Sequence, residues 1–547
     1  MAVEVSKPSN ESGAEGRRRV LIIGLDGVTW DVLGPLMAEG HMPRLAGVVA
    51  DGASGVLHST VPPITPAAWT TFLTGKNPGA HGIIDFERYD VHTNKLSLNS
   101  TFSLDHVRTL WSILGDKGLR VGSVNVPMTY PAKPVNGFLV SGFETPGPRS
   151  DFVYPAILKA EILRRFPDPT LRANWRGGFR ENIDYISRSF HQGAEMTTWL
   201  GDENGWHALM VVFKLTDNLQ HKTWKHIDAR FRDREPAKTE LVKQCFGKAD
   251  KAVGTLLDYA SRHDAAVLIV SDHGHGSLEG KVQANLLLKR WGYLSMRAGT
   301  SPAITRAKFV WDRLRGRTRK FARPGDVLHD LAVDFGRTRA CVMHAGMAGF
   351  LYVNLKGRQP TGIVDPSNYE MLRDELRERF LGDECRVVSP NRETIPLFTA
   401  AHKPEELYGC SREDQPWLPD LILIPHESLA VVRKIRGRKV ARWSSYRQLE
   451  GTHRPEGIWA AWGPDVAHRE NVPANIIDCA PTVLAMLGLP IPKDMQGRVI
   501  EELFAQPPVV AFEDAGEAGE IQPREEAFSE RDLQTVTARL SDLGYLE

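Results

Sequence analysis

The sequence predicts an α/β fold in which a mostly parallel central sheet carries helices on both faces. Short apolar runs rich in β-branched residues recur along the chain, at 19–25, 120–126, 207–216 and 265–271. Continuous runs of this kind are typical of strands that are buried on both faces of a parallel sheet. Segments with helical patterns lie between them, at 104–114 and 237–261, and a parallel sheet requires this alternation.

The chain of 547 residues is too long for one small hydrophobic core. The apolar run at 420–425 (DLILIP) is expected to return to the main sheet. The expected order of domains is a disordered leader (1–18), a core (19–280 and 400–505) interrupted by an inserted smaller α+β subdomain (281–399), and a linker with a C-terminal amphipathic helix (506–547).

Composition narrows the classes of function and location. The formal net charge of +1 gives no general reason to expect a nucleic acid polymer as partner. The five cysteines are scattered without CxxC spacing, which argues against a disulfide framework and a cysteine zinc site. We therefore expect a reducing compartment, the cytoplasm, and no transmembrane segment, because no apolar run reaches the ~18 residues that a spanning helix needs. The sequence does not indicate an oligomeric state.

Thr65 stands within the stretch 61–86, VPPITPAAWTTFLTGKNPGAHGIIDF. Pro66 follows it, and the run from Ala67 to Leu73 is compatible with a helix. A hydroxyl at a helix N-terminus lies beside free backbone N–H groups, which suit an anion. The same Thr-Pro pair also begins ordinary helices, with the threonine as N-cap. Both interpretations stay open on this stretch alone.

Potential metal ligands follow three of the apolar runs, and one more histidine stands in GTHRPEG before a late strand. Ligands of open α/β sheets bind at the carboxyl ends of the strands. Asp26, at the end of RVLIIGLD, could equally be the N-cap of a following helix. The candidate ligands, in chain order, are Asp26, Thr65, Asp217, His221, Asp272, His273 and His453.

These residues divide into two metal sites. One holds Asp217, His221 and His453, and the other holds Asp26, Thr65, Asp272 and His273. Mixed carboxylate and imidazole ligands suit zinc, or manganese where carboxylates are more numerous. Two divalent ions ~3.5–4 Å apart can hold the attacking and leaving oxygens of a displacement at phosphorus. Coordination would also favour the alkoxide of Thr65, which otherwise is a poor nucleophile.

The order of the motifs resembles a known family. LIIGLDG, ITPAAWTTFLTGKNPGAHGI, TDNLQH, SDHGHG and GTHRPEG follow one another as in the alkaline phosphatase superfamily, specifically its type I phosphodiesterase and nucleotide pyrophosphatase branch. With RTRACVMHAGMAGFLYVNLKGRQPTGIV and ANIIDCAPTVLAMLGLP the resemblance covers most of 19–505. It implies an alkaline phosphatase-like fold, Thr65 as the nucleophile that becomes phosphorylated, and the other six residues as ligands of two zinc ions.

The chain departs from this family at one position. Nucleotide pyrophosphatases of the branch usually carry an asparagine that helps to hold the phosphoryl oxygens, and the matching position after HGIID is Phe86. The C/S-x-P-x-R motif of sulfatases is absent, because the chain reads TPAA from Thr65.

We predict a two-metal phosphohydrolase that acts on small-molecule phosphodiesters through a phosphothreonine. The nearby alternative is a phosphomonoesterase or phosphotransferase of the same superfamily, and the alternative of another class is a non-catalytic protein that binds phosphate ligands. The basic stretch from Arg306 to Arg323 is either a solvated helix face or a lid that steers anions. His275 is expected behind the ligands or facing solvent, and Lys214 on the surface or at a phosphate.

Overall fold

The structure is a computed structural model. It describes residues 18–170, 175, 177–297, 333–413, 415–516 and 527–543. The basic stretch at 306–323, nearly all of the expected leader and much of the expected linker lie outside the described residues.

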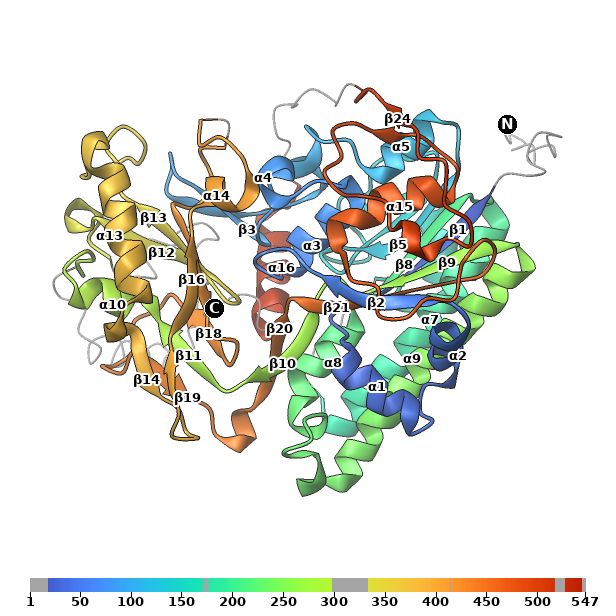
Figure 1. Cartoon of the computed structure of the whole chain (residues 1–547), viewed down its shortest axis with the longest axis horizontal. Helices are drawn as coiled ribbons and strands as arrows, with labels where there is room; N and C mark the ends of the chain where they lie inside the picture. The colour runs from blue at the N-terminus through green and yellow to red at the C-terminus, as the bar shows by residue number, and fades with distance from the viewer. Residues whose placement is uncertain are drawn as a thin grey trace.

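A nine-stranded sheet forms the centre of the larger part of the molecule (Figure 1). Its strands, in spatial order, are β22 (Ala474–Asn475), β2 (Ala53–His58), β21 (Glu456–Trp462), β9 (Ala265–Val270), β1 (Arg19–Leu25), β8 (Ala208–Phe213), β5 (Val121–Val126), β6 (Gly137–Ser141) and β7 (Val153–Tyr154). All of them run in the same direction except β21 and β7. The four apolar runs singled out in the sequence form β1, β5, β8 and β9, so the predicted α/β class is confirmed.

Both faces of this sheet are covered by helices, because the apolar side chains of its central strands point to both faces. In β1, Leu21 and Ile23 belong to one hydrophobic core, while Val20 and Ile22 belong to a second core on the opposite face. The first core packs against α1 (Trp30–Ala38), α2 (Pro43–Asp51), α7 (Phe179–Asn204) and α9 (Pro236–Arg262). The second packs against α3 (Thr65–Thr74), α5 (Leu110–Asp116) and α15 (Cys479–Met486).

A smaller part of the molecule has its own sheets and its own hydrophobic core (Figure 1). A four-stranded sheet has the order β12 (Ala340–Ala345), β13 (Gly349–Val353), β17 (Leu421–Pro425), β16 (Phe398–His402), and a three-stranded sheet has the order β18 (Leu429–Val432), β11 (Gly280–Gln283), β19 (Ala441–Trp443). Helices α10 (Ala284–Arg290), α13 (Tyr369–Leu381) and α14 (Pro404–Tyr408) accompany them. The antiparallel pair β10 (Gly274–Leu278) and β20 (Glu450–Arg454) runs between the two parts.

One strand lies in a different sheet from the one expected. The apolar run at 420–425 forms β17, which pairs antiparallel with β13 and β16, so its expected place in the main sheet is wrong. A short run of apolar residues indicates a buried strand but not which sheet buries it. The boundaries expected for the inserted subdomain stay a prediction.

The last described helix, α16 (Glu530–Leu543), packs on the larger part of the molecule. Its Val536 and Leu540 are buried in the first core, and Phe528 before it contacts Tyr130, with ring centroids 5.2 Å apart. The buried Arg539 donates to backbone carbonyls of a loop after β6, those of Phe143, Thr145 and Pro146. Within the described residues, no helix combines the length and apolar character needed to cross a membrane.

We expect Arg539→Ala to destabilise the protein by roughly 1.5–3 kcal/mol, because it leaves buried carbonyls without donors. Urea unfolding measures the change. Arg531→Ala is the matched control, since Arg531 lies on the exposed side of the same helix and its loss should change stability by less than ~0.5 kcal/mol. Equal effects of the two substitutions would contradict a structural role for the contacts of Arg539.

Candidate metal centre

Three neighbouring strands of the large sheet place acidic residues at one edge. The strands β9, β1 and β8 are adjacent and parallel, so their carboxyl ends meet. Asp272 follows β9, Asp26 follows β1, and Asp217 lies in the first turn of α8 (Leu215–Thr223), directly after β8. Helix α1 begins later, with Thr29 as its N-cap, so the alternative that Asp26 caps this helix is wrong.

Thr65 is the first residue of α3, and its side chain is fully buried. Ile64 occupies the N-cap position, and no side-chain cap bond is formed there, so the interpretation of Thr65 as N-cap is wrong. Its Oγ1 lies 3.2 Å from Nε2 of His273. The hydroxyl therefore points to the carboxyl edge of the sheet, where the aspartates lie.

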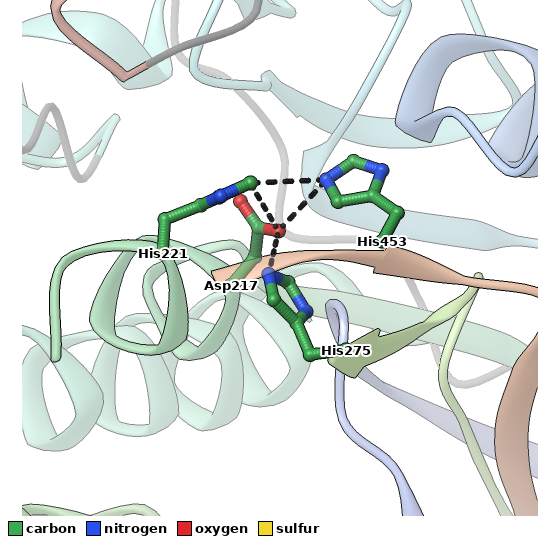
Figure 2. A group of neighbouring side chains, drawn as sticks. All are labelled: Asp217, His221, His275 and His453. Carbon is green, nitrogen blue, oxygen red and sulfur yellow. Dashed lines mark hydrogen bonds and ion pairs between the residues drawn. The ribbon is translucent and has the colours of Figure 1, made fainter. Parts of the chain in front are cut away.

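Four side chains converge on one point beside this edge (Figure 2). Oδ1 of Asp217 lies 3.3 Å from Nε2 of His221, 3.3 Å from Nε2 of His453 and 3.4 Å from Nε2 of His275. Nε2 of His221 and Nε2 of His453 are 3.0 Å apart. We call these four residues the histidine cluster.

His275 was expected behind the ligands or facing solvent, and the solvent-facing expectation is wrong because its side chain is fully buried in the histidine cluster. It lies on β10 directly opposite His453 on β20. The spacing of His273 and His275 carried a usable signal, since residues two apart on an extended chain point to the same side.

Each histidine of the site hydrogen bonds through its other ring nitrogen to a backbone carbonyl. These bonds join Nδ1 of His221 to Gly451 O (2.8 Å), His275 to Gly27 O (2.7 Å), His453 to Pro63 O (2.8 Å) and His273 to Gly274 O (3.0 Å). A carbonyl only accepts, so every Nδ1 donates its N–H. In a neutral ring this leaves the lone pair on Nε2, which faces the site and suits a metal ion.

A second group contains Asp26, Asp217 and His273, whose ligand atoms are close enough to share an ion. Asp272 lies beside them, with Oδ2 3.3 Å from Nε2 of His273. Its Oδ1 accepts from Gly27 N at 3.1 Å. The structure thus gathers all seven residues that the sequence singled out, and Asp217 stands between the two groups.

Lys214 is buried inside the site, so the expectation of a surface lysine is wrong. Its Nζ donates to Oδ1 of Asp26 at 3.0 Å and also to Oδ2 of Asp217. Trp69 of α3 donates from Nε1 to the other oxygen of Asp26 at 2.8 Å. Together these donors fix the orientation of both carboxylates.

Burial and the neighbouring charges shift the pKa values of the three aspartates in the site. Burial raises the pKa of Asp26 to about 6, although Lys214 opposes the shift. Burial and the neighbouring Asp26 raise the pKa of Asp272 well above its usual value. Burial also raises the pKa of Asp217, but Lys214 and His221 outweigh it and hold that pKa well below its usual value.

The pKa values of the buried histidines shift in the opposite direction. Burial lowers the pKa of His453 to about 4 and holds the pKa values of His273 and His275 well below their usual value. These imidazoles are therefore neutral at pH 7, which is the protonation state that binds a metal ion.

The residues fit divalent cations. Within the described part of the chain, Oδ2 of Asp272 and Nε2 of His275 are buried and have no hydrogen-bond partner, as expected of ligands that a metal completes. Gly27 has a φ of 72°, and a Cβ there would lie 2.8 Å from the ring of His275 and 3.0 Å from Oδ1 of Asp217. The turn after β1 therefore needs glycine to let these ligands approach.

Phe86 is buried where the resembling family carries an asparagine. Its ring packs edge-on against Phe143, with centroids 5.6 Å apart. Phe143 in turn lies beside Lys214, whose Nζ is 5.5 Å from the ring centroid. An apolar wall therefore borders this side of the site.

A cavity of about 460 Å³ adjoins the histidine cluster at His275. Apolar side chains such as Val32, Leu36 and Phe246 line one part of it, and charged groups including Arg454 line another. Its size is in the range of small-molecule sites.

A family model, type I phosphodiesterase/nucleotide pyrophosphatase, matches residues 20–456 and agrees with the motifs. Among solved structures, human ectonucleotide pyrophosphatase/phosphodiesterase 5 is similar at 13% identity and a TM-score of 0.48, over 89% of this chain and 100% of that one.

The murine protein of the same name, solved as an inactive variant in complex with AMP, is similar at 12% identity and a TM-score of 0.48, over 86% of this chain and 95% of that one. No match was found among curated proteins. The family model spans most of the sequence, and its match confirms the resemblance that the sequence motifs indicated. The chain belongs to the type I phosphodiesterase/nucleotide pyrophosphatase family of hydrolases.

Proposed function

We propose that the protein is a two-metal phosphodiesterase in which the Thr65 oxygen attacks phosphorus and one ester alcohol leaves, so that Thr65 becomes a phosphothreonine, which water then hydrolyses. The observation that supports this most directly is the position of the Thr65 hydroxyl, 3.2 Å from Nε2 of His273, within the second group of ligands. A nucleophile must lie among the groups that activate it. Thr65 meets this condition, although it is far from those groups in sequence.

Eight side chains would hold the two ions. The histidine cluster would hold one, through Asp217, His221, His275 and His453, and Asp26, Thr65, Asp272 and His273 would hold the other. Bound divalent cations supply Lewis-acid stabilisation of the charge on phosphoryl oxygens and lower the pKa of hydroxyl groups. The nitrogen content of the histidine cluster favours zinc, and the carboxylates of the second group also suit manganese.

The protein's own groups orient the reaction. Lys214 and Trp69 hold the carboxylate of Asp26 by hydrogen bonds to its two oxygens. The N-terminus of α3 directs free N–H groups and a partial positive charge to an anion beside Thr65. Burial of all these groups excludes water and strengthens each interaction.

The charge of the site favours a diester over a monoester. A monoester dianion brings one more negative oxygen than a diester, and that oxygen needs a cation or a donor. Lys214 is already paired with two aspartates, and Phe86 offers no polar group. The alternatives are a monoesterase or phosphotransferase of the same superfamily, and a protein that binds phosphate ligands without turnover.

We also propose that the natural substrate is a small-molecule phosphate ester and that the protein acts in the cytoplasm. The five cysteines are free thiols, and all but Cys410 are buried. Free thiols persist in a reducing compartment, which supports this location.

The role of Thr65 can be tested by its own substitutions. Thr65→Ala should lower kcat by roughly 10³-fold or more, while Thr65→Ser keeps the oxygen and should retain much more activity. Steady-state kinetics and thermal unfolding are measured together. Thr70→Ala is the matched control, since Thr70 is buried in the same helix. Equal losses in the Ala and Ser variants that follow thermal stability would return Thr65 to a structural role.

Metal analysis should find about two divalent ions per chain. His453→Ala and His275→Ala should each lower the occupancy of one ion, because each removes a ligand of the histidine cluster, while circular dichroism stays unchanged. His468→Ala should leave the metal content as it is, because His468 is exposed. Protein without metal and with activity that resists chelators would exclude the two-metal proposal.

Substrate preference separates the proposal from its nearest alternative. An aryl phosphodiester should show a higher kcat/KM than the matched aryl phosphomonoester, by roughly tenfold or more, with the aryl sulfate far behind. Both esters are compared at one pH and one metal concentration. A preference for the monoester would favour the phosphomonoesterase.

A further inference from the structure

A fourth strand ends beside the metal centre, and the proposed function uses nothing from it. Strand β5 is the neighbour of β8 and runs parallel to it. The carboxyl ends of β9, β1, β8 and β5 therefore lie in a row, and the first three lead into the ligands and Lys214. The last residues of β5 are Asn125 and Val126, and they follow the last residue pair between β5 and β8, Val124 with Val211.

The side-chain amide of Asn125 is buried without a hydrogen-bond partner. The residue is 2% exposed, and among the described residues neither Oδ1 nor Nδ2 has a partner. Leaving a buried amide unpaired costs about 1–3 kcal/mol. Native proteins rarely keep such a group unless something outside the chain satisfies it.

The backbone around Asn125 is held in an uncommon conformation. Asn125 has a φ of 57° and Met128 a φ of 64°, and the pairing of β5 with β6 shifts register between Val124 and Val126. Glu144 accepts from Met128 N at 3.0 Å, and Thr129 donates to Val126 O at 2.6 Å. Backbone conformations of this kind persist only where neighbours enforce them, and they concentrate at functional sites.

The loop that enforces this conformation also borders the metal centre. Glu144, which holds Met128, follows Phe143, and the ring of Phe143 lies beside Lys214 and against Phe86. The resemblance implies an asparagine at the position of Phe86 in nucleotide pyrophosphatases, and Phe86 offers no amide there.

We propose that Asn125 binds the phosphate ester, its Nδ2 donating to a phosphoryl oxygen of the substrate on the Lys214 side of the centre. A neutral amide supplies a hydrogen bond without adding charge, which suits the single negative charge of a diester. The inference rests on the proposed phosphodiesterase function. The inference adds Asn125 to that function as a residue that binds the substrate.

The test must separate this role from a structural one, because asparagine also tolerates positive φ better than most residues. Asn125→Gly keeps that backbone conformation and removes the amide. It should lower kcat/KM for an aryl phosphodiester by roughly 10²–10³-fold and weaken inhibition by inorganic phosphate. The free energy of unfolding should stay the same or rise, since an unpaired buried group is lost. Asn125→Asp keeps the shape, replaces the donor with an acceptor, and should lose at least as much activity.

The matched control is Asn94→Gly. Asn94 is also buried and has a φ of 55°, but its Oδ1 accepts a hydrogen bond from Tyr89 at 2.6 Å. This variant should lose stability and keep the wild-type kcat/KM. The two asparagines should therefore show opposite patterns.

Four outcomes would overturn the inference. Asn125→Gly with kcat/KM and phosphate inhibition within threefold of wild type excludes the contact, as does a loss of activity that only follows a loss of stability. If Thr65→Ala abolishes activity while Asn125→Gly does not, this inference fails and the proposed function stands. If the wild type hydrolyses no ester and binds no phosphate, both fail together.

Discussion

Three carboxylates share a fully buried site, and this constraint shapes everything around it. Asp26, Asp217 and Asp272 are each inaccessible to solvent, and burial of an unpaired carboxylate is expensive. Lys214 forms ion pairs with Asp26 and Asp217, but a single ammonium cannot offset three negative charges. The neutral histidines bring ligand nitrogens rather than positive charge. Divalent cations would supply the charge that these residues lack, so the folded centre is itself an argument for metal.

Backbone carbonyls orient the candidate ligands without a bound ion. Carbonyls from four separate segments accept the Nδ1 protons of the site histidines, which fixes both the tautomer and the direction of each lone pair. The carbonyl of Gly27 belongs to the turn that also donates to Asp272. One turn after β1 therefore orients ligands of both groups, which explains why it has no room for a side chain.

The sequence predicted the strands and the candidate ligands that follow them, because buried parallel strands are largely apolar and end at a common edge. It did not place Lys214, since the sequence does not show whether a lysine after a strand turns inward or outward. His275 was missed as a functional candidate because its role depends on partners from distant segments. Asn125 was missed because its role depends on the lack of hydrogen-bond partners among the described residues. The run that forms β17 was recognised as a strand, but an apolar run does not specify its sheet.

The C-terminal helix takes part in the shape of this centre although it is far away in sequence. Arg539 satisfies the carbonyls of Phe143, Thr145 and Pro146, and buried carbonyls without donors would not keep their place. The same loop presents Phe143 to Lys214 and Glu144 to Met128. One side of this loop therefore contacts α16, and the other side forms a wall of the candidate metal centre. The rigidity of this wall depends on the contacts of Arg539, so a residue near the end of the described chain helps to hold the wall beside the candidate metal centre.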